Sequence, residues 1–174
     1  MAGVAERARR VRLAIFDVDG VLTDGTLYLG PEGEAFKAFD VQDGHGVKML
    51  QAAGIAIAII SGRSSRVVER RALELDIAHV SQGVSDKLAE FERLTARLGI
   101  AAEDCAFVGD DLPDLPVMQR CGFAVAVANA VEAVKAGAHH VTRAGGGRGA
   151  VREFCELILA SRGAAIDSAA NRRA

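Results

Sequence analysis

Acidic side chains gather at two points of the sequence, each directly after an apolar run. Asp17 and Asp19 end the run that begins at Leu13. The second group follows the apolar residues before Gly109 and consists of Asp110, Asp111 and Asp114. Carboxylates brought together would raise one another's pKa, and a divalent cation would offset that repulsion. Because every ligand atom would be an oxygen, the two groups predict a Mg²⁺ site.

Two further polar residues follow strand-like segments. Ser61 lies within Ile59–Arg63, and Lys87 ends the segment Gly83–Lys87. Phosphoryl transfer requires a nucleophile, a metal ion, and donors or cations around the non-bridging oxygens. Taken singly, Ser61 is typical of a helix entry and Lys87 of a solvated surface. Together with the acidic groups they predict phosphoryl-transfer chemistry.

The elements that must position these residues alternate between short apolar runs and longer helical stretches. This alternation is typical of a parallel sheet covered by helices on both faces. The predicted strands are Arg12–Asp17, Ile55–Ile60, His79–Ser81, Asp104–Gly109, Phe123–Val127 and His139–Thr142. The predicted helices are Asp43–Ala53, Ser64–Leu75, Ser85–Leu98, Pro113–Arg120, Ala130–Ala136 and Gly149–Leu159. The pattern indicates a three-layer, Rossmann-like α/β fold, whose ligands bind beyond the carboxyl ends of the strands.

Capping residues mark several helix boundaries. Ser64 and Ser85 are expected to cap the helices that they open. Gly54 and Gly99 stand where a left-handed residue ends a helix. These signals bound the helices on either side of the central strands.

A β-hairpin is predicted between the first strand and the first helix. Thr26–Asp40 holds two partly alternating runs around a Gly-Pro-Glu-Gly turn. Its apolar residues would be costly to leave in water and predict a subunit contact. They are Leu27, Leu29, Phe36 and Phe39. The alternative is that the hairpin folds back on its own domain.

Length and composition favour one domain. The chain has 174 residues, half of them hydrophobic, which is ample for one core. We expect a flexible N-terminus over 1–10, a folded domain over 11–162, and a disordered tail over 163–174.

Charge and hydropathy exclude other classes. The net charge of −2 offers no basic field for nucleic acid. The longest apolar run, Ile55–Ile60, is too short to span a membrane. Three widely spaced cysteines indicate neither a disulfide framework nor a zinc site. These observations favour a cytoplasmic protein that acts on a small anionic substrate.

The motifs, in this order, resemble those of the haloacid dehalogenase superfamily over nearly all of Leu13–Leu159. Asp-x-Asp-Gly-x-x-x-Asp begins at Asp17, and Gly-Asp-Asp-x-x-Asp begins at Gly109. The resemblance implies that Asp17 is a nucleophile that becomes an aspartyl phosphate, and that Asp19 acts as general acid and then as base. It implies that Ser61 and Lys87 bind the phosphoryl oxygens. The implied Mg²⁺ ligands are Asp17, the backbone carbonyl of Asp19, and Asp110, with support from Asp111 and Asp114.

Neither usual position holds room for a cap domain over the active site. Only the hairpin follows the first motif, and residues 62–83 hold one helix and a short strand. With this hairpin and no cap domain, the chain resembles the tetrameric 3-deoxy-D-manno-octulosonate 8-phosphate phosphatases. The similar stretches are Phe16–Gly25, Asp43–Gly46, Ile60–Arg63 and Val141–Glu153. The resemblance implies a homotetramer in lipopolysaccharide biosynthesis, in which a neighbouring subunit closes the site.

That family's substrate carries a carboxylate far from its phosphate, so a cation away from the metal is needed. Arg63, Arg71 and Arg148 are the available guanidinium groups. His45 either contacts substrate or caps a helix. Related phosphatases of 2-keto-3-deoxynononate 9-phosphate tend to place a glutamate at the position of Arg63, so arginine favours the eight-carbon acid. The alternative is that Arg63 pairs on a helix surface.

A glycine-rich segment, Gly145–Ala150, weakly matches a dinucleotide-binding fingerprint. It opens the last predicted helix rather than a first βαβ unit, which argues against that function. We interpret it as a mobile segment that brings Arg148 over a neighbour's active site, with a plain loop as the alternative. His139 and His140 are assigned no role.

Two other functional classes share some of these features. A receiver-like signalling module also combines acidic residues, a hydroxyl, a lysine and Mg²⁺. Its adjacent acidic pair lies on the first strand, whereas here the pair Asp110 and Asp111 comes late. A non-catalytic assembly domain with this fold is disfavoured by the complete acidic set.

Overall fold

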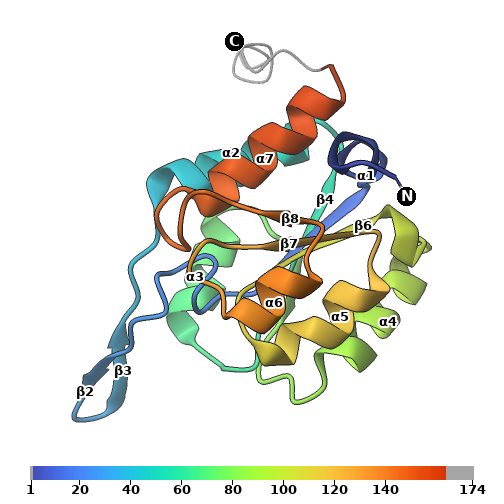
Figure 1. The fold of residues 1–174 in the computed structure, drawn as a ribbon. Helices are drawn as coiled ribbons and strands as arrows, with labels where there is room; N and C mark the ends of the chain where they lie inside the picture. The colour runs from blue at the N-terminus through green and yellow to red at the C-terminus, as the bar shows by residue number, and fades with distance from the viewer. Residues whose placement is uncertain (1, 164–174) are drawn as a thin grey trace.

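The computed structural model describes residues 2–163 and shows a six-stranded parallel sheet between two layers of helices (Figure 1). The strand order is β5-β4-β1-β6-β7-β8. The strands of this sheet are β1 (Leu13–Phe16), β4 (Ala56–Ile60), β5 (His79–Ser81), β6 (Cys105–Gly109), β7 (Phe123–Ala126) and β8 (His140–Val141). The predicted three-layer α/β fold is confirmed.

Helices cover both faces of the sheet, so β1 and β6 are buried along their whole length. One layer contains α1 (Val4–Arg10), α2 (Val41–Ala52) and α7 (Ala150–Ser161), and α3 (Arg66–Glu74) lies beside α2. The other layer contains α4 (Lys87–Leu98), α5 (Leu115–Arg120) and α6 (Glu132–Gly137). Short 3₁₀ turns, η1 (Ala102–Asp104) and η2 (Leu112–Asp114), flank β6.

The polar helix caps lie one residue later than expected. The Ser65 hydroxyl, not that of Ser64, accepts a hydrogen bond from the Val68 amide at the start of α3. Asp86 rather than Ser85 caps α4. Gly54 and Gly99 have φ of +79° and +62°, so both adopt the left-handed conformation expected of them.

The N-terminus differs from the flexible segment expected over 1–10. Val4–Arg10 forms α1, which packs against α7 and buries Ala8 completely. An Arg7 guanidinium nitrogen donates to the Gly122 carbonyl at 2.6 Å. Apolar residues at helical spacing therefore attach this segment to the domain. The tail expected over 163–174 lies outside the described residues except for Gly163.

The predicted hairpin is present as β2 (Tyr28–Gly30) and β3 (Gly33–Phe36), and it projects from the body of the domain (Figure 1). The Tyr28 and Phe36 rings stack with centroids 4.3 Å apart. Leu29 and Phe36 are 67% and 53% exposed. Phe39 does not share this exposure, because it packs against the core.

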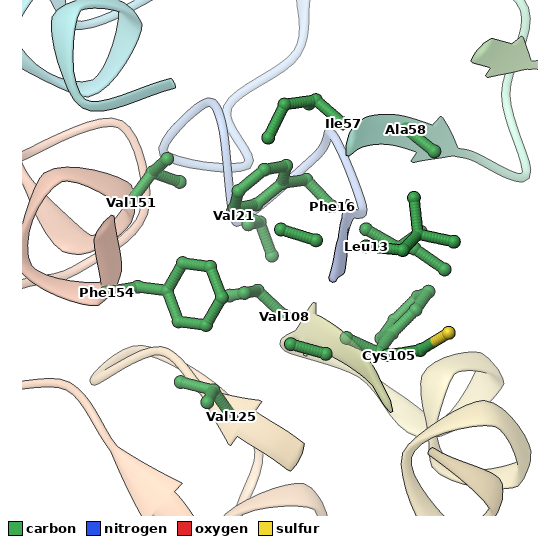
Figure 2. Close-up of a cluster of buried hydrophobic side chains, with 14 of the residues drawn as sticks. Leu13, Phe16, Val21, Ile57, Ala58, Cys105, Val108, Val125, Val151 and Phe154 are labelled. Carbon is green, nitrogen blue, oxygen red and sulfur yellow. The ribbon is translucent and has the colours of Figure 1, made fainter. Parts of the chain in front are cut away.

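Aromatic side chains join the sheet to α7 in the core (Figure 2). The Phe154 ring meets Phe16 edge-on at 5.6 Å and stacks on Phe123 at 6.2 Å. Val21 and Val108 lie beside Phe16 and Phe154 in Figure 2. This cluster lies under the chain segment that turns sharply after β1, so it supports the first acidic group from below.

Removal of the Phe154 ring should therefore destabilise the whole domain. We expect Phe154→Ala to lower the free energy of unfolding by about 3–5 kcal/mol, measured by urea denaturation. Leu73→Ala is the control, because Leu73 is 78% exposed on α3. It should change stability by less than about 0.5 kcal/mol. Similar losses in both variants would contradict this account of the core.

Candidate active site

Asp17 lies at the carboxyl end of β1 and is 7% exposed. The Lys87 ammonium lies 2.9 Å from Asp17 Oδ2 and 2.7 Å from Asp114 Oδ1. Burial disfavours the charged form of Lys87, but the two carboxylates outweigh it and raise the lysine pKa. Burial and then Asp114 raise the pKa of Asp17 to about 6, against the opposing effect of Lys87. Lys87 therefore joins the two acidic groups that the sequence predicts.

Asp114 is fully buried and organises the loop after β6. Its Oδ2 accepts hydrogen bonds from the Asp110 and Asp111 amides at 2.9 and 3.2 Å. Because Oδ1 of Asp114 is held by Lys87, both of its oxygens are occupied. Asp114 therefore shapes the site, as the support role implied.

Asp110 is a partly buried carboxylate whose Oδ1 oxygen is itself buried and unsatisfied. Its Oδ1 has no hydrogen-bond partner among residues 2–163. Burial, followed by Asp17 and Asp114, raises the pKa of Asp110 to about 7. Its Oδ2 lies so close to Gly20 that a Cβ there would approach it to 2.0 Å, and Gly20 has a φ of +91°. Only glycine fits at this turn, which lets Asp110 reach the end of β1.

The carboxylate cluster fits a divalent cation. Oxygens of Asp17, Asp110 and Asp114 all lie within 4.8 Å of one another. Since Asp114 is engaged by Lys87 and backbone amides, Asp17 and the unpaired oxygen of Asp110 are the available carboxylate ligands. An all-oxygen set of this kind suits Mg²⁺. The backbone carbonyl of Asp19 stays a predicted third ligand.

The side chain of Asp19 contacts Lys37 and Arg63, whereas that of Asp17 contacts Lys87. Its Oδ1 forms an ion pair with Lys37 Nζ, and its Oδ2 lies 3.5 Å from Arg63 Nε. Lys37 is also paired with Glu34 at 2.9 Å. Burial disfavours the charge on Lys37, but the two carboxylates outweigh it and raise the pKa of Lys37.

Sequence reasoning missed Lys37 and Glu34. Both lie on the predicted hairpin, where a glutamate three residues before a lysine is typical of a solvated surface pair. Nothing in one sequence shows that the hairpin stem turns inward. These two residues become visible only when the loop after β1 and the base of the hairpin are seen together.

An open cleft of about 410 Å³ lies above the carboxylates. Ser61, which is 2% exposed, lines it together with Gly62 and Arg63. The Ser61 amide donates to the Ser81 carbonyl at 2.9 Å, and the Ser61 carbonyl accepts from the Val84 amide at 3.1 Å. These bonds fix the turn after β4 and place Ser61 beside the acidic cluster.

Of the four residues predicted to bind substrate, Arg63 alone lines the cleft within residues 2–163. Arg71 lies over the Phe39 ring, pairs with Glu74 at 3.4 Å, and donates to the Asp40 carbonyl. His45 and Arg148 are also elsewhere. His45 Nδ1 lies 3.1 Å from an Arg152 nitrogen, and an Arg148 nitrogen lies 3.3 Å from Asp24 Oδ2. Within this chain, these three residues do not join the carboxylate site.

The glycine-rich segment is packed against its own chain rather than extended away from it. A Cβ on Gly146 would lie 1.8 Å from the Gly20 carbonyl oxygen. Asn129 bridges the two loops, because its amide donates to that carbonyl at 3.0 Å and its oxygen accepts from the Gly146 amide at 2.6 Å. The glycines thus allow close contact with the loop after β1. This differs from the expected mobile segment.

The raised pKa values give metal-free protein a defined pH dependence. Between about pH 4 and pH 7 the folded chain retains a proton on Asp110 that the unfolded chain has released. The free energy of unfolding should therefore fall as pH rises. Asp17, with a pKa of about 6, contributes in the same direction. In chelator, we expect urea denaturation to show lower stability at about pH 8 than at about pH 5, and Asp110→Asn to reduce that difference.

Added Mg²⁺ should restore stability at about pH 8 in the wild type more than in Asp110→Asn. Asp104→Asn is the control, since Asp104 pairs with Arg10 and Arg12 on the surface. It should follow the wild-type profile. A wild-type pH dependence unchanged by Asp110→Asn would contradict the assigned charge crowding.

Residues 74–151 match the family model of haloacid dehalogenase-like hydrolases. The Escherichia coli K12 3-deoxy-D-manno-octulosonate 8-phosphate phosphatase is 49% identical over 93% of this chain and 86% of the relative. The crystal structure of the Yersinia pestis phosphatase of that name has a TM-score of 0.90, with 49% identity over 92% of this chain and 87% of that one.

The Moraxella catarrhalis 3-deoxy-D-manno-octulosonate 8-phosphate phosphatase also has a TM-score of 0.90. It is 47% identical, with 92% of each chain covered, and its structure is a complex with a magnesium ion, a phosphate ion and 3-deoxy-D-manno-octulosonate. Identity of this extent covers most of both chains and accompanies a shared fold. The chain belongs to the 3-deoxy-D-manno-octulosonate 8-phosphate phosphatase family of haloacid dehalogenase-like hydrolases.

Proposed function

We propose that this protein hydrolyses 3-deoxy-D-manno-octulosonate 8-phosphate to the sugar acid and phosphate, as a Mg²⁺-dependent enzyme of lipopolysaccharide biosynthesis. The observation that carries the proposal is the buried carboxylate of Asp17, paired with Lys87 and adjacent to the unsatisfied oxygen of Asp110. Such a group can attack phosphorus only where a cation offsets the repulsion between two anions. The relatives' names and the bound groups of the Moraxella catarrhalis structure support the substrate and the metal.

The proposed reaction assigns each step to a side chain at the cleft. A carboxylate oxygen of Asp17 bonds to phosphorus while the bond from phosphorus to the sugar oxygen breaks. Asp19 donates a proton to that departing oxygen. Water then attacks phosphorus, Asp19 accepts its proton, and the bond from Asp17 to phosphorus breaks. Lys87 and Ser61 contact the non-bridging oxygens, and bound Mg²⁺ would neutralise part of their charge.

Recognition of the sugar acid is assigned first to Arg63. Its side chain is 49% exposed at the cleft, so its guanidinium can reach a carboxylate at the far end of the substrate. Arginine at this position, where the related nine-carbon phosphatases tend to place a glutamate, favours the eight-carbon acid. Arg71, His45 and Arg148 lie outside this chain's cleft, so a substrate role for them would require another arrangement or a neighbouring subunit.

We place the enzyme in the cytoplasm. No helix within residues 2–163 is both long and apolar enough to cross a membrane. The three cysteines are buried and unpaired. A reduced compartment suits these free thiols.

Replacement of Asp17 by asparagine tests the chemistry. Asp17→Asn should reduce Mg²⁺-dependent phosphate release from 3-deoxy-D-manno-octulosonate 8-phosphate by at least about 10³-fold, because an amide is a poor nucleophile. Binding of substrate, measured calorimetrically, should be largely retained. Asp104→Asn is the matched surface control and should keep wild-type turnover. Equal turnover by wild type and Asp17→Asn would overturn the assigned nucleophile, and a panel of sugar-acid phosphates would define the preferred substrate.

We further propose that the hairpin forms a contact in a homotetramer. The exposed Leu29 and Phe36 give it an apolar surface that water solvates poorly. The double variant Leu29→Ser, Phe36→Ser should yield smaller species by light scattering and lower turnover. Leu73→Ser, at a comparably exposed leucine on α3, should remain tetrameric. A fully active wild-type monomer would contradict a shared site.

A further inference from the structure

The stem of the hairpin contains a buried cation to which the reaction above gives no role. Lys37 follows β3, and its side chain is 2% exposed, whereas lysine is almost never buried unless it is paired. Its ammonium contacts Asp19 Oδ1 and lies 2.9 Å from Glu34 Oε2. The hairpin therefore delivers one charge directly to the residue that acts as acid and base.

Lys37 is itself held from behind. Glu34 accepts a hydrogen bond from the Ser65 hydroxyl, and Ser65 caps α3. A continuous series of polar contacts thus runs from the start of α3 through Glu34 and Lys37 to Asp19. Because each member is fixed by a neighbour, the ammonium has little freedom to move away from Asp19.

The two oxygens of Asp19 have unequal surroundings. Oδ1 is taken by the buried Lys37, whereas Oδ2 lies 3.5 Å from Nε of Arg63, whose side chain is half-exposed at the cleft. We infer that Lys37 is a positioning residue for Asp19. It holds Oδ1, sets the plane of the carboxyl group, and leaves Oδ2 to face the leaving oxygen. This inference rests on the proposed phosphatase function.

The role of Lys37 can be assigned to particular steps. When the bond from Asp17 to phosphorus forms, the bond to the sugar oxygen breaks and the proton on Asp19 Oδ2 passes to that oxygen. When water attacks and the Asp17 ester bond breaks, a proton of the water returns to Oδ2. Lys37 gives and takes no proton in either step. A misdirected Oδ2 would slow both transfers without weakening the attack by Asp17.

The leaving group provides the decisive readout. A sugar alkoxide is a strong base and needs the proton, whereas nitrophenolate departs without one. We expect Lys37→Met to lower kcat for 3-deoxy-D-manno-octulosonate 8-phosphate by about 100-fold. The same variant should lower the rate at which p-nitrophenyl phosphate phosphorylates the enzyme by less than about threefold. The second rate is measured as the single-turnover burst of nitrophenolate. Asp19→Asn should show the same selectivity for the leaving group, and Lys37→Arg should recover most of the sugar-phosphate rate.

Lys135→Met is the matched control, because Lys135 pairs with Glu132 on the surface of α6. It should leave both rates unchanged. If Lys37→Met unfolds, the double variant Lys37→Met, Glu34→Gln removes both members of the hairpin ion pair and supplies the same comparison. Equal losses for both esters in a folded variant would overturn the positioning role. If the wild type releases phosphate from neither ester, the proposed function is overturned as well.

Discussion

The crowding of carboxylates at the ends of β1 and β6 is the constraint on which the rest of the site depends. Asp17, Asp110 and Asp114 approach within 4.8 Å, and burial raises the cost of ionising them together. Lys87 offsets part of that charge by contacting two of the three. The remaining imbalance, expressed as a raised pKa at Asp110, favours a divalent cation in the cluster. The crowded carboxylates repel one another and lower the stability of the metal-free chain. The same negative charge attracts a divalent cation.

The sheet and core hold this unfavourable arrangement in place. Parallel pairing of β1 with β6 aligns Phe16 with Val108, so the residues that follow leave the sheet at the same edge. Phe154 packs beneath that edge, and the buried Asp114 fixes the second loop through backbone amides. Since the apolar contacts lie directly under the charged groups, the stability of the core offsets the cost of crowding them.

The hairpin carries polar residues that face the active site and apolar residues that face the solvent. Glu34 and Lys37 face inward and contact Ser65 and Asp19. Leu29, which pairs opposite Glu34 in the hairpin, remains exposed and offers an apolar surface. An assembly built on this surface would therefore be coupled mechanically to the acid and base of the same chain.

The sequence by itself determined the parallel α/β framework, because alternating apolar runs and helices leave few ways to bury both faces of a sheet. It also identified Asp17, Ser61, Lys87 and Asp110, since the carboxyl ends of parallel strands meet at one edge.

Only the tertiary structure decided which distant side chains reach that edge. Lys37 is carried inward by the hairpin stem, while Arg71 is held over Phe39 away from the cleft. The glycines near Gly146 pack on the Gly20 loop, and α1 packs on α7. A single sequence encodes residue types and local periodicity, but these contacts depend on how separate elements pack in space.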